Sequence, residues 1–523
     1  MLNLKAPSLE WALRHARRGD TDIFPPIFEF DAIQEDWLAL RDYLVKQNVL
    51  TWPTRARREC LLPKGPLAFR TGTQLDPLDF LLYSATVYEI GEKIEARRIT
   101  TRRGRVFSSR FAPDSSGRLY NPNIGYQEFQ AATVKLLESD KFHTVVVTDI
   151  SDFYHRIYHH RLENALNAAA PGTPHVTAIM KLLDGWCDRN SYSLPIGPPV
   201  SRLLAELTLS DVDSGLEGEQ IRFLRYNDDY RIFSKSDADG YRALGILAQL
   251  LHGMHGLTLQ PGKTDILSAA DFRARVLPTE EDMEITQLRE RFREFIEQLG
   301  LPSEYEELGA TVLTDEQTEL LDSLNLSSML QNELARGGQL ELKIVRFVLN
   351  RMAQLGREDI VDDVLDNVDR LFPVFDNVIR YIKSLSGLTA RRRREIGRRV
   401  LGLTKNSIVG ELEYHRMWAM ELFVESDEWN SKDRFQTVLA RYPDHFTRRN
   451  AILAMGRSQQ SHWFSSNASR VLEEPPWPRR AFLAAMTCLP PDRVKHFHGA
   501  LESRLDPLEV AVAKWARQHP FRS

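Results

Sequence analysis

Cysteine is scarce in this sequence: three cysteines, Cys60, Cys187 and Cys488, stand among 523 residues. So few and so widely separated thiols exclude a disulfide framework and a structural zinc cluster, and a reducing, cytoplasmic compartment is expected. The sequence also lacks an apolar run long enough to cross a bilayer, and residues 1–20 have no apolar core of a signal peptide. We therefore expect neither secretion nor a membrane-spanning helix.

Charge of one sign is also lacking overall, because 68 Lys and Arg stand against 72 Asp and Glu, which leaves a net charge of -4. Net charge therefore indicates no class of partner. Locally the balance differs, since residues 96–112 carry several arginines and no acidic residue: Arg97, Arg98, Arg102, Arg103, Arg105 and Arg110. This basic stripe is either a solvated face or a surface that neutralises phosphates.

What the chain does have is length and two kinds of pattern. At about 150 residues per domain, its length predicts two to four domains. Residues 141–270 mix short β-rich segments with helical ones, which indicates an α+β domain. Beyond residue 278 the β-rich segments stop and apolar residues recur at helical spacing. Residues 448–455 partly repeat at 479–486, which favours a HEAT-like helical repeat over an irregular helical bundle.

Three aspartates carry the strongest chemical signal. Asp228 and Asp229 stand between segments 221–225 and 230–234, which are predicted to be the strands of a hairpin, and Asp149 ends another β-rich segment. Three carboxylates at neighbouring strand ends repel one another unless hard divalent cations lie among them, as in a two-metal site for phosphoryl transfer. The alternative for the pair alone is a hairpin turn with solvated acids.

Two further segments surround these carboxylates in the sequence. Residues 194–201 form a Pro- and Gly-rich turn before a helical run, and such a turn lets backbone approach a nucleotide closely. Residues 256–264 contain Lys263 but miss the spacing of a phosphate-binding P-loop. Lys263 is better interpreted as a cation near a pyrophosphate group.

In this order and at these separations, the four segments resemble the palm motifs A to D of reverse transcriptases. The resemblance implies that Asp149, Asp228 and Asp229 hold two Mg²⁺ ions, with Mn²⁺ as an alternative, and that Ile150 lends a backbone carbonyl. It implies that Tyr154 is a steric gate favouring dNTPs and that Lys263 donates a proton to pyrophosphate. The same resemblance assigns three further substrate-binding residues: Pro195, Gly197 and Ser201.

Residues 69–77 and 106–111 look like the fingers segments of bacterial reverse transcriptases. The resemblance makes Arg70 and Arg110 candidates for contacts to the triphosphate or the template backbone. It also favours the functional reading of the basic stripe, with phosphate neutralisation as the mechanism.

The long helical tail narrows the type of enzyme. A palm followed by such a tail, with the segment 475–481 in it, resembles the abortive-infection and related defence-associated reverse transcriptases of bacteria. The resemblance implies residues 1–275 as fingers and palm and residues 276–523 as an α-helical HEAT-like domain in place of a thumb. It further implies protein-primed DNA synthesis that can proceed without a template, a covalently attached DNA product and antiphage defence. The exposed faces expected of helical repeats favour a homo-oligomer. Tyr43 is one candidate for the priming hydroxyl.

Two other functions remain open at this point. One is a conventional reverse transcriptase that copies a dedicated RNA template. The other is an inactive polymerase fold that only binds nucleic acid, against which the three retained and mutually repelling carboxylates argue.

Overall fold

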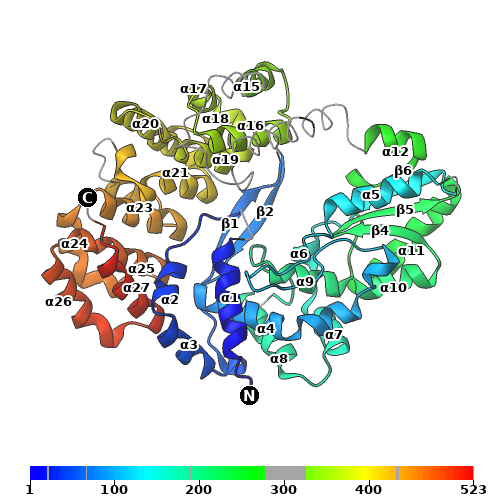
Figure 1. The fold of residues 1–523 in the computed structure, drawn as a ribbon, viewed down its shortest axis with the longest axis horizontal. Helices are drawn as coiled ribbons and strands as arrows, with labels where there is room; N and C mark the ends of the chain where they lie inside the picture. The colour runs from blue at the N-terminus through cyan, green and yellow to red at the C-terminus, as the bar shows by residue number, and fades with distance from the viewer. Residues whose placement is uncertain are drawn as a thin grey trace. The chain divides into compact units, whose positions relative to one another are not determined.

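The computed structural model describes residues 1–19, 23–65, 67–139, 141–187, 190–276, 287, 325–430 and 435–521. The chain forms two compact units, of which the first comprises residues 1–57 and 73–279 and the second residues 58–72 and 280–523. Figure 1 shows the elements of both. None of the helices in the described ranges is long and apolar enough to span a bilayer.

The first unit combines a four-stranded sheet with helices. Its strands are β3 (Thr144–Asp149), β4 (Arg222–Tyr226), β5 (Asp229–Ser234) and β6 (Asp265–Ser268). Its longer helices are α1 (Ala6–Arg18), α2 (Glu29–Glu35), α3 (Trp37–Val45), α4 (Pro77–Arg97), α5 (Tyr126–Leu137), α7 (His159–Ala169), α8 (Pro174–Trp186), α9 (Val200–Thr208), α10 (Ser210–Gly218), α11 (Asp237–His255) and α12 (Ala269–Arg275). Short turns of helix are α6 (Phe153–Arg156), η1 (Val49–Thr51), η2 (Thr101–Arg103) and η3 (Pro261–Lys263).

The sheet is antiparallel with strand order β4-β5-β3-β6. Successive side chains of β3 face opposite sides of the sheet. Val145 packs into a cluster with Phe129 of α5, whereas Val146 lies beside Gly240 of α11. The sheet is therefore covered by a helix on each face (Figure 1), which explains why β3 is an almost unbroken apolar run.

The expected strands of this sheet are confirmed, including the hairpin of β4 and β5. The helical run expected after the turn of residues 194–201 is interrupted, because Leu209 has a ψ of 0° between α9 and α10.

The second unit contains a hairpin and many helices. The hairpin strands are β1 (Arg58–Pro63) and β2 (Phe69–Gln74), the last two residues of which belong to the first unit. The helices are α15 (Leu326–Ala335), α16 (Leu342–Leu355), α17 (Val361–Asp366), α18 (Val368–Leu371), α19 (Phe375–Lys383), α20 (Ala390–Asn406), α21 (Glu413–Glu425), α22 (Gln436–Arg441), α23 (His445–Arg457), α24 (Ser461–Asn467), α25 (Pro476–Ala485), α26 (Pro491–Leu501) and α27 (Pro507–Gln518). Short 3₁₀ helices are η4 (Phe372–Val374), η5 (Ile408–Gly410), η6 (Asp427–Trp429), η7 (Ala468–Glu473), η8 (Met486–Cys488) and η9 (Glu502–Arg504).

The helical character expected of the tail is confirmed for the described part of residues 325–521, which holds no strand. Helices α21, α23, α25 and α27 contact one another in that order. The two copies of the short internal repeat lie in α23 and α25, where the equivalent Arg449 and Arg480 are both buried. Residues 58–72 were expected with the first domain, but their contacts group them with these helices.

Candidate active site

The three sequence-predicted aspartates lie at one end of the β3–β5 pair. Asp149 is the last residue of β3 and Asp229 the first of β5, and the two are directly paired across the strands. Asp228 belongs to the two-residue turn between β4 and β5, and its carbonyl accepts a hydrogen bond from the Ile150 amide at 3.2 Å. Asn227, the other turn residue, has φ +53°, a conformation that Asn tolerates better than most residues. The hairpin therefore brings Asp228 and Asp229 to the end of the motif A strand.

Lys263 lies at the same place. Residues 256–264 run beside β3, where the Gln260 amide donates to the Asp149 carbonyl at 2.8 Å and the Thr148 and Thr264 hydroxyls are 2.7 Å apart. The Lys263 ammonium forms an ion pair with the Asp149 carboxylate. Burial lowers the pKa of Lys263, but Asp149 and the two other aspartates outweigh burial and raise it, so the side chain stays protonated.

The donor set fits a hard divalent cation in its chemistry, since carboxylate oxygens are the ligands that Mg²⁺ prefers. Asp149 is 5% exposed, Asp228 is half-buried and Asp229 is exposed, so the set faces both protein and solvent. Within the described ranges, however, no three His, Cys, Asp or Glu side chains are gathered as a metal-binding group. Since Asp149 is paired with Lys263, a cation at this carboxylate requires the lysine to move away.

A buried network of charges supports the turn that carries Asp228. The Arg225 guanidinium donates to Asp213 at 2.8 and 2.5 Å, lies 3.0 Å from Glu206, and donates to the Asn227 carbonyl at 2.8 Å. The Asn227 amide in turn donates to the Ser108 hydroxyl at 2.9 Å. The turn is therefore held by two hydrogen bonds at Asn227, one between its carbonyl and Arg225 and one between its amide and Ser108.

Glu206 joins this network to the end of α4. It accepts hydrogen bonds from Arg98 and from Ser108, each at 2.6 Å. Arg98, Glu206 and Arg225 are all at most 4% exposed. Burying a charge is tolerated when it is paired and hydrogen-bonded, as each of these is.

This network of buried charges was not predicted from the sequence, although two charged residues in apolar segments indicate it. Glu206 interrupts an apolar helical run and Arg225 interrupts an apolar strand. A charged residue inside such a run needs a buried partner of opposite sign. The sequence does not say which acid meets which base.

The turn of residues 194–201, which corresponds to motif B, lies against the backbone of Thr73. The Thr73 amide donates to the Ile196 carbonyl at 2.7 Å. A Cβ atom on Gly197 would lie 2.2 Å from the Thr73 carbonyl oxygen, so no larger residue fits there. Pro195 is buried, and half-buried Tyr154 accepts a backbone hydrogen bond from Leu194 at 3.0 Å. The segments bearing the predicted gate and the predicted nucleotide turn are therefore neighbours.

Two of the predicted substrate contacts are corrected by the structure. Ser201 is 1% exposed and its hydroxyl lies 3.3 Å from that of Tyr83, inside the protein. Arg110 is 2% exposed, pairs with Glu95 at 2.9 Å and donates to the carbonyls of Ile99 and Val106. Both side chains are buried and bound by other protein groups, so neither is accessible to a triphosphate.

The basic stripe divides into two kinds of arginine. Arg98 and Arg110 are buried in the interactions above and half-buried Arg105 lies 3.5 Å from Glu217, whereas Arg97, Arg102 and Arg103 are exposed. The exposed three lie at the end of α4 and in η2. Only this part of the stripe can meet a phosphate backbone.

The remaining candidates lie on other elements. Arg70 is an exposed residue of β2 in the second unit. Tyr43 is half-buried in α3, with its ring 6.3 Å from that of Trp52.

Comparison with known proteins matches part of this chain to one protein family. Residues 98–309 match the family model described as reverse transcriptase (RNA-dependent DNA polymerase). No curated protein matches the chain. Among solved structures, telomerase from Candida albicans in complex with a TWJ fragment of telomeric RNA is 12% identical, with a TM-score of 0.31, over 80% of this chain and 70% of that one. Apo telomerase from Candida tropicalis is 9% identical, with a TM-score of 0.32, over 92% and 74% of the two chains.

Proposed function

Since residues 98–309 carry a reverse transcriptase domain, the domain of RNA-directed DNA polymerases, we propose that this chain adds dNTPs to a growing DNA by two-metal phosphoryl transfer. The observation that carries the proposal is the pairing of Asp149 with Asp229 across β3 and β5, with Asp228 on the adjoining turn. The family match includes all three aspartates.

Each residue of the site has a defined task in this reaction. Asp149, Asp228, Asp229 and the Ile150 carbonyl would hold two Mg²⁺ or Mn²⁺ ions. When bound, such ions lower the pKa of an attacking hydroxyl and neutralise the charge of the triphosphate. Lys263, protonated beside Asp149, moves to the departing pyrophosphate and donates a proton to it. The buried Arg225–Glu206 pair holds the turn and thereby positions Asp228.

Substrate selection falls to the neighbouring loop. Pro195 and Gly197 shape the turn on which the incoming nucleotide lies, and the ring of Tyr154 excludes a ribose 2′-hydroxyl. Exposed Arg97, Arg102 and Arg103 offer charge to a nucleic-acid backbone, and Arg70 is a further candidate. These assignments explain why a dNTP rather than an rNTP is the proposed substrate.

Priming by a protein hydroxyl, synthesis without a template and a role in antiphage defence complete the proposal. They are supported by the resemblance to abortive-infection enzymes and by the helical unit after the polymerase domain. Tyr43 is one candidate for the primer, and the helices of the second unit are proposed to form HEAT-like repeats that mediate homo-oligomerisation. A conventional enzyme copying a bound RNA is the competing function.

The test is incorporation of labelled dNTPs by the purified full-length chain with Mg²⁺ and neither primer nor template. The proposal predicts label that runs with the protein on a denaturing gel and is released by protease. The Asp228→Asn/Asp229→Asn variant should give none, and Tyr43→Phe should give none if Tyr43 is the primer. Asp265→Asn, which changes an exposed acid on β6, is the matched control and should label normally.

Two other results would change the function. Extension only when an RNA template and a DNA primer are supplied would establish the templated enzyme and reject protein priming. No incorporation under either condition, with oligonucleotide binding retained, would leave a nucleic-acid-binding module.

A further inference from the structure

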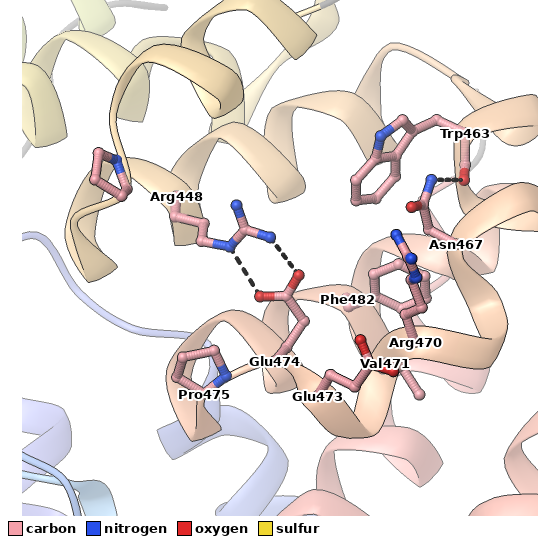
Figure 2. Close-up of a pocket in the computed structure, with 10 residues that line it drawn as sticks. Arg448, Trp463, Asn467, Arg470, Val471, Glu473, Glu474, Pro475 and Phe482 are labelled. Atoms are coloured by element: carbon pink, nitrogen blue, oxygen red, sulfur yellow. Dashed lines mark hydrogen bonds and ion pairs between the residues drawn. The ribbon is translucent and has the colours of Figure 1, made fainter.

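The second unit contains a cavity that the polymerase reaction does not use. Its volume is about 410 Å³, and it is lined by residues of α23, α24, η7 and α25 and by the chain before α25. Figure 2 shows Arg448 and Glu474 on one side and Trp463 on the other, with Arg470 below Trp463 on that side and Glu473 at the lower rim. The size lies within the range of small-ligand sites.

One wall of the cavity is electrically neutral and fixed. Arg448 pairs with Glu474 through two hydrogen bonds, of which the one from Nε is 2.8 Å long. The hydrogen bonds and charge of Glu474 raise the pKa of Arg448. A bidentate pair of this kind is rigid, so it shapes the wall and leaves no net charge for a ligand.

The opposite wall is aromatic. The Trp463 indole is half-buried and lies 5.1 Å from the ring of Phe464 and 5.6 Å from that of Phe482. Those two rings hold the indole in place, while its remaining surface faces the cavity (Figure 2). A held indole with an open face is a platform on which a planar ring can stack.

The rim supplies one cation and one acceptor. Arg470 and Glu473 are both exposed, and neither forms a hydrogen bond or ion pair with the described residues. A guanidinium beside an indole matches a phosphate attached to a stacked base. A carboxylate can accept a hydrogen bond from the exocyclic amino group of cytosine, which thymine lacks.

From these features we propose that the cavity binds one nucleotide of single-stranded DNA, with its base on Trp463 and its phosphate on Arg470. The inference rests on the proposed function, because a polymerase produces the strand that would enter. It adds a second nucleic-acid site, carried by the helical unit and separate in sequence from the polymerase domain.

Photocrosslinking tests where the strand lies. The probe is a short oligodeoxycytidylate with one 5-iodo base, irradiated with the full-length Asp228→Asn/Asp229→Asn protein so that no synthesis occurs. Trypsin then releases residues 458–470, which contain Trp463, as one peptide. The proposal predicts the crosslink on this peptide and a strongly reduced yield in Arg470→Ala, where the lost cleavage site makes the corresponding peptide 458–479. Crosslinks confined to other peptides would overturn it.

Binding measurements on the same background supply the controls. Trp463→Ala should weaken oligonucleotide binding about tenfold or more, as expected for one lost base stack, and Trp463→Phe should restore much of it. Arg470→Ala should reduce the salt dependence by about one phosphate contact. Arg504→Ala, which removes an exposed arginine of another 3₁₀ helix, η9, should change neither.

Two outcomes would contradict the proposal. Equal affinity and salt dependence in all four variants would exclude the cavity as a strand site. Displacement of the strand by an equal concentration of free dCMP would assign the cavity to mononucleotides instead. Failure of dNTP incorporation, with the crosslink retained, would overturn the polymerase function alone.

Discussion

Arg225 donates two hydrogen bonds to Asp213, at 2.8 and 2.5 Å, from a position that is 0% exposed. Burial lowers the pKa of Arg225, but the carboxylates of Asp213 and Glu206 outweigh burial and hold the pKa well above its usual value. The guanidinium is therefore charged, and it donates further hydrogen bonds to Glu206 and to the Asn227 carbonyl. A structural ion pair thus sits directly under the turn that bears Asp228.

Replacing Arg225 by Met should destabilise the first unit by about 3–5 kcal/mol, because it leaves the buried Asp213 carboxylate without its cationic partner and removes one of the two arginines paired with Glu206. Thermal unfolding followed by calorimetry measures the change. Arg242→Met removes an exposed pair with Asp239, 3.1 Å long, and should change stability by no more than about 0.5 kcal/mol. Equal effects of the two substitutions would show that the buried network does not support the fold.

Gly197→Ala should impair both folding and dNTP incorporation. The added methyl group would meet the Thr73 carbonyl oxygen at 2.2 Å, and the glycine has φ +156°. We expect a loss of about 1–3 kcal/mol and displacement of the turn before α9. Gly245→Ala, in the exposed middle of α11 with no atom near the new methyl, should instead stabilise by up to about 1 kcal/mol. A silent Gly197→Ala in the same assays would contradict the close approach.

His498 makes the stability of the second unit depend on pH. Burial lowers its pKa from 6.5 to about 4, and Arg517 adds to the effect. Between these two values the unfolded chain binds a proton that the folded chain does not, so the free energy of unfolding falls as pH falls. The contribution is up to about 3 kcal/mol.

Unfolding of wild type and His498→Gln at pH 5 and pH 7 checks this expectation. The variant should lose much of the difference between the two pH values. His496→Gln, an exposed histidine of the same helix α26, should keep the difference. The expectation fails if His498→Gln shows the same pH dependence as wild type.

Arg58 should anchor the β1–β2 hairpin within the second unit. Its guanidinium lies 4.2 Å from the ring centre of Phe446 and 3.8 Å from that of Trp477, a buried pair of cation–π contacts. Arg58→Ala should therefore increase hydrogen exchange over residues 58–72. Lys64→Ala, at an exposed position after β1, should leave exchange unchanged, and equal exchange in both variants would contradict the anchoring role.

Much of the first unit could be predicted because its signals are local. The apolar run 145–147 and the Asn-Asp turn specify a buried strand and a hairpin, and these two elements carry all three aspartates. Lys263 followed from its place in the motif order. The sequence alone predicts such strands and turns, since each of them depends on a few adjacent residues.

The errors concern residues whose role depends on partners far along the chain. The resemblance to a fingers segment made Arg110 a candidate phosphate ligand, but Glu95 and two backbone carbonyls bind its guanidinium. The palm resemblance assigned Ser201 to substrate binding, whereas its hydroxyl is buried against that of Tyr83. The resemblance placed residues 58–72 with the fingers and palm, whereas β1 contacts α21 and η4, and Arg58 lies over the rings of Phe446 and Trp477 in the second unit.

Binding of Mn²⁺, followed by electron paramagnetic resonance of the purified full-length protein with a dNTP, tests most directly whether the three aspartates form the polymerase centre. The account predicts bound Mn²⁺ in wild type and in Asp265→Asn, and its loss in Asp149→Asn and in Asp228→Asn/Asp229→Asn. Wild-type binding retained in Asp149→Asn and in the double variant would contradict the account, because the carboxylates paired across β3 and β5 would then hold no metal.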